Sequence, residues 1–325
     1  MSQKDLRDEI NEEVSTILGK DFQIDVTTTT TVPHSSDGSI TFPNLDTKRQ
    51  GAKLIETCVL YIDIRRSTAL NFSHKQQTVA KLYSAFVRAM TRCARFYKGH
   101  VRGIIGDRVM VIFDQKDCFS NAVHCAIAMN TVSQHILNKH FTRNEVECGI
   151  GIDYGTMLAT KTGVRRKGVE QNNYRNLVWL GRPANVASKL TDMANKPEES
   201  FKYPIVEAGF EQRNFGILAT GPDWKWREIY ATDFVQQLTV EPLTHKMLHN
   251  DPTFRSMFTS ERTHVRIPKT KPILMTEAVW SGYKAANPTS VVVTNKLFTE
   301  ITLSVPAYRG KVLAGDPFYP DLKPE

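Results

Sequence analysis

A single acidic residue inside an apolar run constrains the folding of this chain more than any other feature of its sequence. Residues 58–64 read Cys-Val-Leu-Tyr-Ile-Asp-Ile, an apolar and β-branched run that is typical of a buried strand. A carboxylate inside such a strand costs several kcal/mol unless a partner compensates it. The fold therefore has to bring a cation, a donor group or water to Asp63.

A second apolar segment carries a carboxylate in a comparable position. Residues 101–113 form two short apolar runs joined at Gly106-Asp107, and this pattern predicts a hairpin that turns at those two residues. If the two segments are neighbouring strands, Asp63 and Asp107 can share divalent cations, which prefer hard oxygen ligands. The alternative is that both are structural residues neutralised by nearby cations. The nearby cations in the sequence are Arg65, Arg66 and Arg108.

The composition excludes several classes of protein. Of the 325 residues, 41% are hydrophobic, which is enough for a core, and no apolar run reaches the roughly 18 residues of a membrane-spanning helix. The first ten residues are charged and lack the apolar centre of a signal peptide. The five cysteines lack metal-ligand spacing, which indicates reduced thiols in a cytoplasmic protein. The net charge of +8 suits a polyanionic substrate, whereas the absence of basic runs interleaved with aromatic residues argues against nucleic acid.

The spacing of apolar residues predicts an α+β chain. Helical spacing covers residues 5–18, 75–98 and 118–139, and residues 177–194 read as a strand, a Gly-Arg-Pro turn and a helix. Further strands are predicted at 22–26, at 58–64, on both sides of Asp107, at 146–155 and at 157–160. This order predicts helices packed on one face of a sheet that contains antiparallel pairs.

Three motifs in register resemble the class III nucleotidyl cyclases. They are Tyr61-Ile-Asp-Ile with Thr68, the Gly106-Asp107 pair, and Gly181-Arg-Pro-Ala-Asn-Val-Ala-Ser-Lys-Leu190, which match in order and spacing over residues 54–195. The resemblance implies a ferredoxin-like α+β cyclase domain with a largely antiparallel sheet. It also implies a head-to-tail homodimer with active sites at the interface, each built from both protomers.

The resemblance assigns roles to five residues. Asp63 and Asp107 match the two metal aspartates, and the Ile64 carbonyl would also reach a metal, with two divalent cations, Mg²⁺ or Mn²⁺, in each site. Asn185 and Lys189 match the Asn and Arg that hold the ribose and stabilise the transition state. The implied reaction is attack of the ribose 3′-hydroxyl on the α-phosphorus of a nucleoside triphosphate, with release of pyrophosphate.

Departures from the family pattern concern the base. Gly103 and Val178 occupy the positions at which purine cyclases carry polar side chains that read the base, and neither offers a side-chain hydrogen bond. Tyr61 shares a strand face with Asp63 and could offer its hydroxyl to a smaller base, and Ile105 would line the same pocket. Lys189 replaces the commoner Arg, which keeps the charge but loses the planar fork.

These features together resemble the pyrimidine cyclases of the bacterial Pycsar anti-phage systems. The resemblance implies a cytoplasmic uridylate or cytidylate cyclase, a phosphorus–oxygen lyase, with UTP placed ahead of CTP. Its effector would respond to the cyclic nucleotide without binding the cyclase, and neither nucleic acid nor a membrane would be a partner. Two alternatives remain open at this stage. One is a pseudocyclase that binds nucleotide without turnover, and the other is an adenylate cyclase with an atypical base pocket.

The remaining sequence is divided by one further likeness. A strand and helix that usually follow in the family are matched to residues 290–301. We therefore expect a lead-in over 1–50, a cyclase core over 51–195, an insertion or separate subdomain over 196–288 and a return to the core over 289–325.

Two further residues are candidates for binding the triphosphate. Lys311 lies where the family carries a triphosphate-binding lysine in a late strand, although an exposed terminal hairpin would account for it equally well. The second triphosphate-binding side chain, an arginine in the family, is expected just before the strand at 177–180. Arg175 is the candidate, with Arg165 and Arg166 as alternatives.

Overall fold

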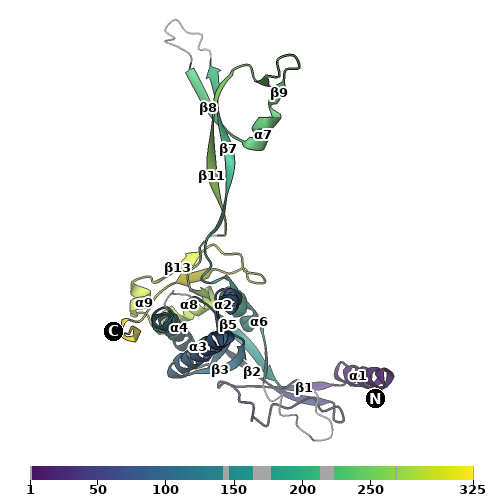
Figure 1. Ribbon diagram of the computed structural model, residues 1–325. Helices are drawn as coiled ribbons and strands as arrows, with labels where there is room; N and C mark the ends of the chain where they lie inside the picture. Colours follow the sequence, from purple (N-terminus) through teal and green to yellow (C-terminus); the bar gives the residue numbers. More distant parts are fainter. Residues whose placement is uncertain (1, 142–145, 164–176, 213–222, 268, 325) are drawn as a thin grey trace. The chain divides into compact units, whose positions relative to one another are not determined.

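The computed structural model describes residues 2–141, 146–163, 177–212, 223–267 and 269–324, and divides the chain into two compact units. The first unit comprises Met1–Lys196 and Thr270–Glu325, and the second comprises Pro197–Lys269. Figure 1 labels the elements of both. Among the described residues, none of the helices has the length and apolar character needed to cross a bilayer.

A nine-stranded sheet forms the centre of the first unit. Its main path runs in the order β13-β14-β12-β5-β2-β4-β3, with β1 paired to β2 and β6 paired to β5. The pairs are antiparallel except β1 with β2 and β12 with β5. The strands are β1 (Gln23–Thr28), β2 (Arg49–Ile64), β3 (Gly99–Ile105), β4 (Arg108–Phe113), β5 (Cys148–Thr160), β6 (Val178–Leu180), β12 (Ile273–Thr276), β13 (Phe298–Ile301) and β14 (Val312–Gly315).

Helices of the first unit confirm the predicted α+β class. The helices are α1 (Gln3–Ile17), α2 (Ser67–Ser73), α3 (Gln76–Phe96), α4 (Cys118–Thr131), α5 (Asn138–His140), α6 (Arg182–Met193), α8 (Glu277–Ala286) and α9 (Val291–Thr294). A π-helical turn (Val132–Leu137) follows α4, and a 3₁₀ turn (Pro320–Leu322) lies near the C-terminus. The predicted helix over 118–139 is therefore divided in three, and the strands predicted at 146–155 and 157–160 are one continuous strand, β5.

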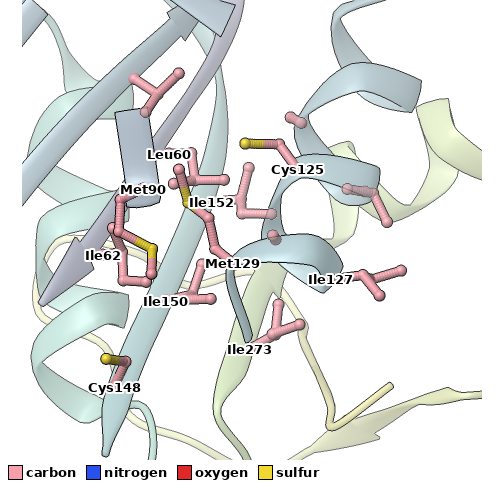
Figure 2. Close-up of a cluster of buried hydrophobic side chains, with 14 of the residues drawn as sticks. Leu60, Ile62, Met90, Cys125, Ile127, Met129, Cys148, Ile150, Ile152 and Ile273 are labelled. Carbon is pink, nitrogen blue, oxygen red and sulfur yellow. The ribbon is translucent and has the colours of Figure 1, made fainter. Parts of the chain in front are cut away.

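Side-chain alternation divides the sheet into two apolar faces. Even-numbered residues of β2 and β5 pack beneath α3 and α4 in the larger core, and Figure 2 shows Leu60, Ile62, Ile150 and Ile152 beside Met129. All five cysteines are free, and four of them are buried. The odd-numbered residues of β2, including position 63, therefore face the other side of the sheet.

Helix α6 covers that other side. Ala184 and Ala187 pack against Val59 of β2 and Met157 of β5. The helix approaches β5 closely because residue 151 is a glycine: a Cβ there would lie 2.2 Å from the Ala187 carbonyl oxygen and 2.5 Å from a backbone nitrogen of the same helix. The glycine-interrupted strand in the sequence therefore marks the place where α6 crosses the sheet.

The N-terminal segment contributes an edge strand and an exposed helix. Strand β1 pairs in parallel with the start of β2, so this lead-in is attached to the central sheet. Helix α1 has no buried residue, and its apolar side chains Leu6, Ile10 and Val14 are between 43% and 50% exposed. Within a single chain, the described residues therefore leave the apolar stripe of α1 uncovered.

The second unit is a small antiparallel sheet with its own core. Its strands pair in the order β11-β7-β8, and a short hairpin of β9 and β10 accompanies them. Val206, Phe210 and Phe234 are buried on one face of this sheet, while Trp226 stacks between Trp224 and Phe258 on exposed surface. The elements are β7 (Glu199–Gln212), β8 (Asp223–Tyr230), α7 (Ala231–Gln236), β9 (Leu238–Val240), β10 (Met247–His249) and β11 (Phe254–Ile267).

The far boundary of the second unit lies earlier than the sequence indicated. The interruption was expected over 196–288, but the second unit ends at Lys269. Strand β12 returns the chain to the centre of the main sheet, hydrogen-bonded between β5 and β14. The segment predicted to return at 290–301 instead forms α9 and the edge strand β13. Four residues of β12 are too few to show a strand period, which is why the sequence pattern missed them.

The close crossing at Gly151 leads to a stability prediction. We expect Gly151→Ala to lower the free energy of unfolding by about 2–3 kcal/mol, because the new methyl group meets helix backbone that a rotamer change cannot move. Urea denaturation monitored by circular dichroism measures the change. Gly38→Ala is the matched control, since a Cβ at that position has nothing within 4 Å. Equal stability of the two variants would contradict the packing described here.

Candidate active site

The fold brings the two predicted carboxylates to the same edge of the sheet. Strands β2 and β4 are antiparallel neighbours with Ile62 opposite Val109, so Asp63 near the end of β2 lies beside the turn that precedes β4. Gly106 occupies that turn with φ +61°, a left-handed conformation that side chains disfavour, and it positions Asp107. The predicted juxtaposition of Asp63 and Asp107 is therefore present in a single chain.

Asp107 carries an unsatisfied oxygen. Its Oδ2 atom is buried and has no hydrogen-bond partner among the residues that the structure describes. Burial raises the pKa of Asp107 above its usual value of 3.8, and the charge of Asp63 raises it further, while the Ser67 hydroxyl opposes the shift. Two carboxylates held this close, one with a free oxygen, form a site that a hard cation would stabilise.

The donors fit a divalent cation in part. No group of three or more His, Cys, Asp or Glu side chains that could hold a metal is found in the described part of the chain. Two carboxylates would therefore supply the side-chain ligands, and further oxygens have to come from backbone, water or a bound phosphate, as is usual for Mg²⁺. Ile64, the residue that follows Asp63, is buried, and its carbonyl oxygen remains a predicted metal ligand.

Arg108 links the carboxylates to α6. Its Nη2 donates to Asp63 Oδ2 at 2.7 Å and also to the Asp192 carboxylate, while its Nη1 donates to Ser188 Oγ at 2.9 Å. Burial works against its charge, but the bonds to Asp63 and Asp192 raise the pKa of the guanidinium above its ordinary value. The sequence named Arg108 only as one of three possible neutralising cations, and it offered no signal for the bonds to α6.

Arg65 fixes the C-terminal end of α6 against β5. Its guanidinium donates to the carbonyl oxygens of Thr191 and Asp192 at 2.5 and 3.2 Å. It lies over Gly149, where a Cβ would stand 2.4 Å from its Nη2. Thr191 Oγ1 also donates to the Tyr61 carbonyl oxygen at 3.2 Å. These contacts hold the end of α6 beside the carboxylate pair.

The predicted catalytic residues of α6 share a helix face with Ser188 and Asp192. Asn185 is exposed and Lys189 is half-buried, four residues apart on one side of the helix. Within the described part of the chain, no hydrogen bond or ion pair joins either of them to Asp63 or Asp107. Within a single chain, Ser188 and Asp192 therefore connect α6 to Asp63 through the Arg108 guanidinium.

The predicted base pocket is only partly assembled. Tyr61 and Gly103 lie opposite Met110 on either side of β4, and the Tyr61 hydroxyl donates to Met110 Sδ at 2.8 Å. Ile105 is 80% exposed. Met110, which strand pairing places between Tyr61 and Gly103, is a residue of the predicted pocket region that the sequence analysis missed.

Val178 is separated from these three residues by strand register. It pairs with Thr160, nine residues along β5 from Gly151, which is the partner of Tyr61. At about 3.3 Å per residue this corresponds to roughly 30 Å of strand. The structure therefore does not bring Val178 close to Tyr61 and Gly103, although Gly103 and Val178 were expected to contact the same base.

The two triphosphate candidates have different outcomes. Lys311 is exposed, precedes β14 and donates to Glu300 Oε2 at 2.9 Å, so within one chain it forms a surface ion pair with an edge strand. Arg175, like Arg165 and Arg166, lies outside the described residues.

Comparisons with known proteins agree with these motifs. Residues 51–198 match the family described as the adenylate and guanylate cyclase catalytic domain. A protein named uridylate cyclase from Burkholderia cepacia is 29% identical over 53% of this chain and 72% of its own length. One named cytidylate cyclase from Staphylococcus aureus is 30% identical over 33% of this chain and 28% of its own length. Among solved structures, the adenylyl cyclase CyaB from P. aeruginosa is similar with a TM-score of 0.48, at 14% identity over 83% of this chain and 98% of that one.

The crowding of the carboxylates predicts the effect of neutralising one of them. Because the folded pKa of Asp107 lies above 3.8, the folded state holds this proton more tightly than the unfolded chain, and the stability that the group contributes is lost as pH rises through the folded pKa. We therefore expect Asp107→Asn to be more stable than wild type at pH 7 after chelator treatment, with a difference that shrinks as pH is lowered toward 4. Thermal unfolding between pH 4 and 7 measures this, with the exposed Asp117→Asn as control. A variant less stable than wild type at pH 7 would show that Asp107 is not under repulsion.

Proposed function

The chain belongs to the class III nucleotidyl cyclase family through residues 51–198, and from this premise we propose that it cyclises a pyrimidine nucleoside triphosphate. The products would be the 3′,5′-cyclic monophosphate and pyrophosphate. The observation that carries the proposal is the pair Asp63 and Asp107, held side by side with one buried carboxylate oxygen unpaired. Arg108 compensates only part of this charge, so a bound cation would stabilise the pair further.

The carboxylates have a defined task in this proposal. They would hold two divalent cations, Mg²⁺ or Mn²⁺, which when bound lower the pKa of the ribose 3′-hydroxyl and offset the charge of the triphosphate. Asp63 lies near the end of β2 and Asp107 in the two-residue turn between β3 and β4, so the distance between them depends on the β2–β4 register and on the conformation of that tight turn. The Ile64 carbonyl is proposed as a further oxygen ligand.

The residues of α6 are proposed to act on a nucleotide bound by a second protomer. Asn185 is exposed and Lys189 is half-buried, and within the described residues neither bonds to the carboxylates of its own chain, which suits a site shared between two protomers. In a head-to-tail homodimer, Asn185 would orient the ribose and Lys189 would offset charge that grows on the phosphoryl oxygens. Lys311 and Arg175 are proposed to bind the triphosphate.

The choice of base follows from what the pocket lacks. Gly103 offers no polar side-chain atom, so a purine finds no side-chain hydrogen-bond partner at that position, and Val178, which strand register separates from Gly103, offers none either. Tyr61 can exchange its bond to Met110 for one to a pyrimidine, because a thioether is a weak acceptor. The relatives named uridylate and cytidylate cyclase support a pyrimidine, and we place UTP ahead of CTP.

The biological setting that fits this chemistry is anti-phage signalling in the bacterial cytoplasm. The cyclic pyrimidine would be the messenger, and an effector would bind the messenger and not the cyclase. A pseudocyclase is the competing possibility, because Lys189 replaces an arginine and Arg108 already occupies an oxygen of Asp63.

A substrate competition tests the activity directly. We expect purified protein given ATP, GTP, CTP and UTP together with Mn²⁺ to yield a single cyclic pyrimidine, identified by chromatography and mass spectrometry. Asp63→Asn and Asp107→Asn should each lower the rate about a thousandfold, since each loses a carboxylate ligand, while Asp117→Asn should not. Cyclic AMP as the main product would overturn the base assignment, and bound triphosphate without pyrophosphate release would favour the pseudocyclase.

Restoring a polar reader at position 103 should change the base preference. Lysine fits there, because a Cβ at position 103 lies 3.5 Å from Met110 and meets no closer atom. We expect Gly103→Lys to raise the ratio of purine to pyrimidine cyclisation about tenfold, the value of one well-placed hydrogen bond. Gly103→Met is the matched control, because it fills similar space without a hydrogen-bond donor. An unchanged ratio in the Lys variant would remove Gly103 from the pocket.

A further inference from the structure

Arg108 makes the most consequential contact of the candidate site. It follows Asp107 directly in the sequence, yet its guanidinium turns to the other carboxylate and donates to Asp63 Oδ2 at 2.7 Å. The same guanidinium also bonds Asp192 and Ser188, which lie one turn apart on α6. One side chain therefore connects β2, the β3–β4 hairpin and α6.

The charges around Arg108 explain why it takes this place. Asp63 and Asp107 lie close together in partly buried space, and the more exposed Asp192 of α6 reaches the same guanidinium as Asp63. Arg108 neutralises Asp63 and Asp192 and leaves Asp107 Oδ2 without a partner among the described residues. An incoming divalent ion thus finds one free oxygen on Asp107, but an oxygen of Asp63 is already in use.

The two acceptors of Arg108 differ in their surroundings. The side chain of Asp63 is 18% exposed and that of Asp192 is 56% exposed. If Arg108 released Asp63, it would keep a carboxylate and a hydroxyl on α6, so its charge would remain paired. Arg108 can therefore exchange Asp63 for Asp192 as its main carboxylate partner without its own charge becoming unpaired.

We propose that Arg108 is a built-in competitor of the first divalent ion, which has to displace it from Asp63 onto Asp192 and Ser188 of α6. The inference rests on the proposed role of Asp63 and Asp107 as metal ligands. It assigns Arg108 a positioning role that is separate from catalysis. Because Lys189 adjoins Ser188 in the sequence and Asn185 lies one turn before, the exchange also couples metal binding to the helix that carries the proposed catalytic residues.

Binding of Mn²⁺ without nucleotide tests the competition. Free Mn²⁺ is followed by electron paramagnetic resonance during titration of the full chain. We expect Arg108→Gln to bind Mn²⁺ about tenfold more tightly than wild type, because a charge-assisted hydrogen bond no longer has to be broken. Arg66→Gln is the matched control: it makes the same change of charge three residues from Asp63, at a side chain that is 67% exposed, and should alter affinity by less than about twofold.

Asp192 tests the exchange itself. With Asp192→Asn, Arg108 has Asp63 as its remaining carboxylate, so Mn²⁺ should bind more weakly than to wild type. In the Arg108→Gln background, the same Asp192→Asn change should have no effect, since the residue acts only through the arginine. A loss of affinity that persists in the double variant would mean that Asp192 acts on the ion directly, and would overturn the exchange.

The remaining outcomes separate this inference from the proposed function. Affinity that is unchanged or lower in Arg108→Gln, in a protein that binds Mn²⁺ through Asp63 and Asp107, would overturn the competition and leave the metal site intact. No Mn²⁺ binding by either wild type or Arg108→Gln would overturn the metal role and the inference together. As a second readout, Mn²⁺ should raise the melting temperature of Arg108→Gln more than that of wild type, which a purely structural arginine would not produce.

Discussion

The structure depends on how the negative charge at the end of β2 is compensated. Strand β2 is buried on both faces because it lies between β4 and β5 and under helices on either side, so a carboxylate near its end cannot be solvated freely. Arg108 compensates part of this charge through its ion pair with Asp63, whereas the neighbouring carboxylate of Asp107 adds to it. Both residues lie at the same end of β2, and every proposed function of the site begins there.

The second requirement is the close approach of α6 to the sheet. Gly149 and Gly151 leave room on β5 for the Arg65 guanidinium and for the helix backbone, respectively. The helix brings Ser188 and Asp192 within reach of Arg108, while Asn185 on the same helix face stays exposed. One face of α6 therefore carries both contacts within the chain and an exposed predicted catalytic residue, which suits a site that two protomers would share.

Much of the fold was predictable because its signals are local. The apolar periods predicted the main helices and strands, and the Gly106 turn predicted the hairpin that delivers Asp107. The predictions were less accurate where an element is short or its role depends on remote pairing. Strand β12 has four residues and is recognised as central only by its hydrogen bonds to β5 and β14, so the end of the second unit was placed at 288 in the sequence and at Lys269 by the structure.

The sequence by itself determined which residues are candidates for the chemistry, since Asp63, Asp107 and the α6 motif are recognisable by residue type and spacing alone. The tertiary structure decided what these residues contact. It gave Arg108 the acceptors Asp63, Ser188 and Asp192, and it separated Val178 from Tyr61 along β5. The physical reason is that residue type and period are properties of neighbours in the chain. Which charge meets which, and at what strand register, depends on contacts between segments far apart in the sequence.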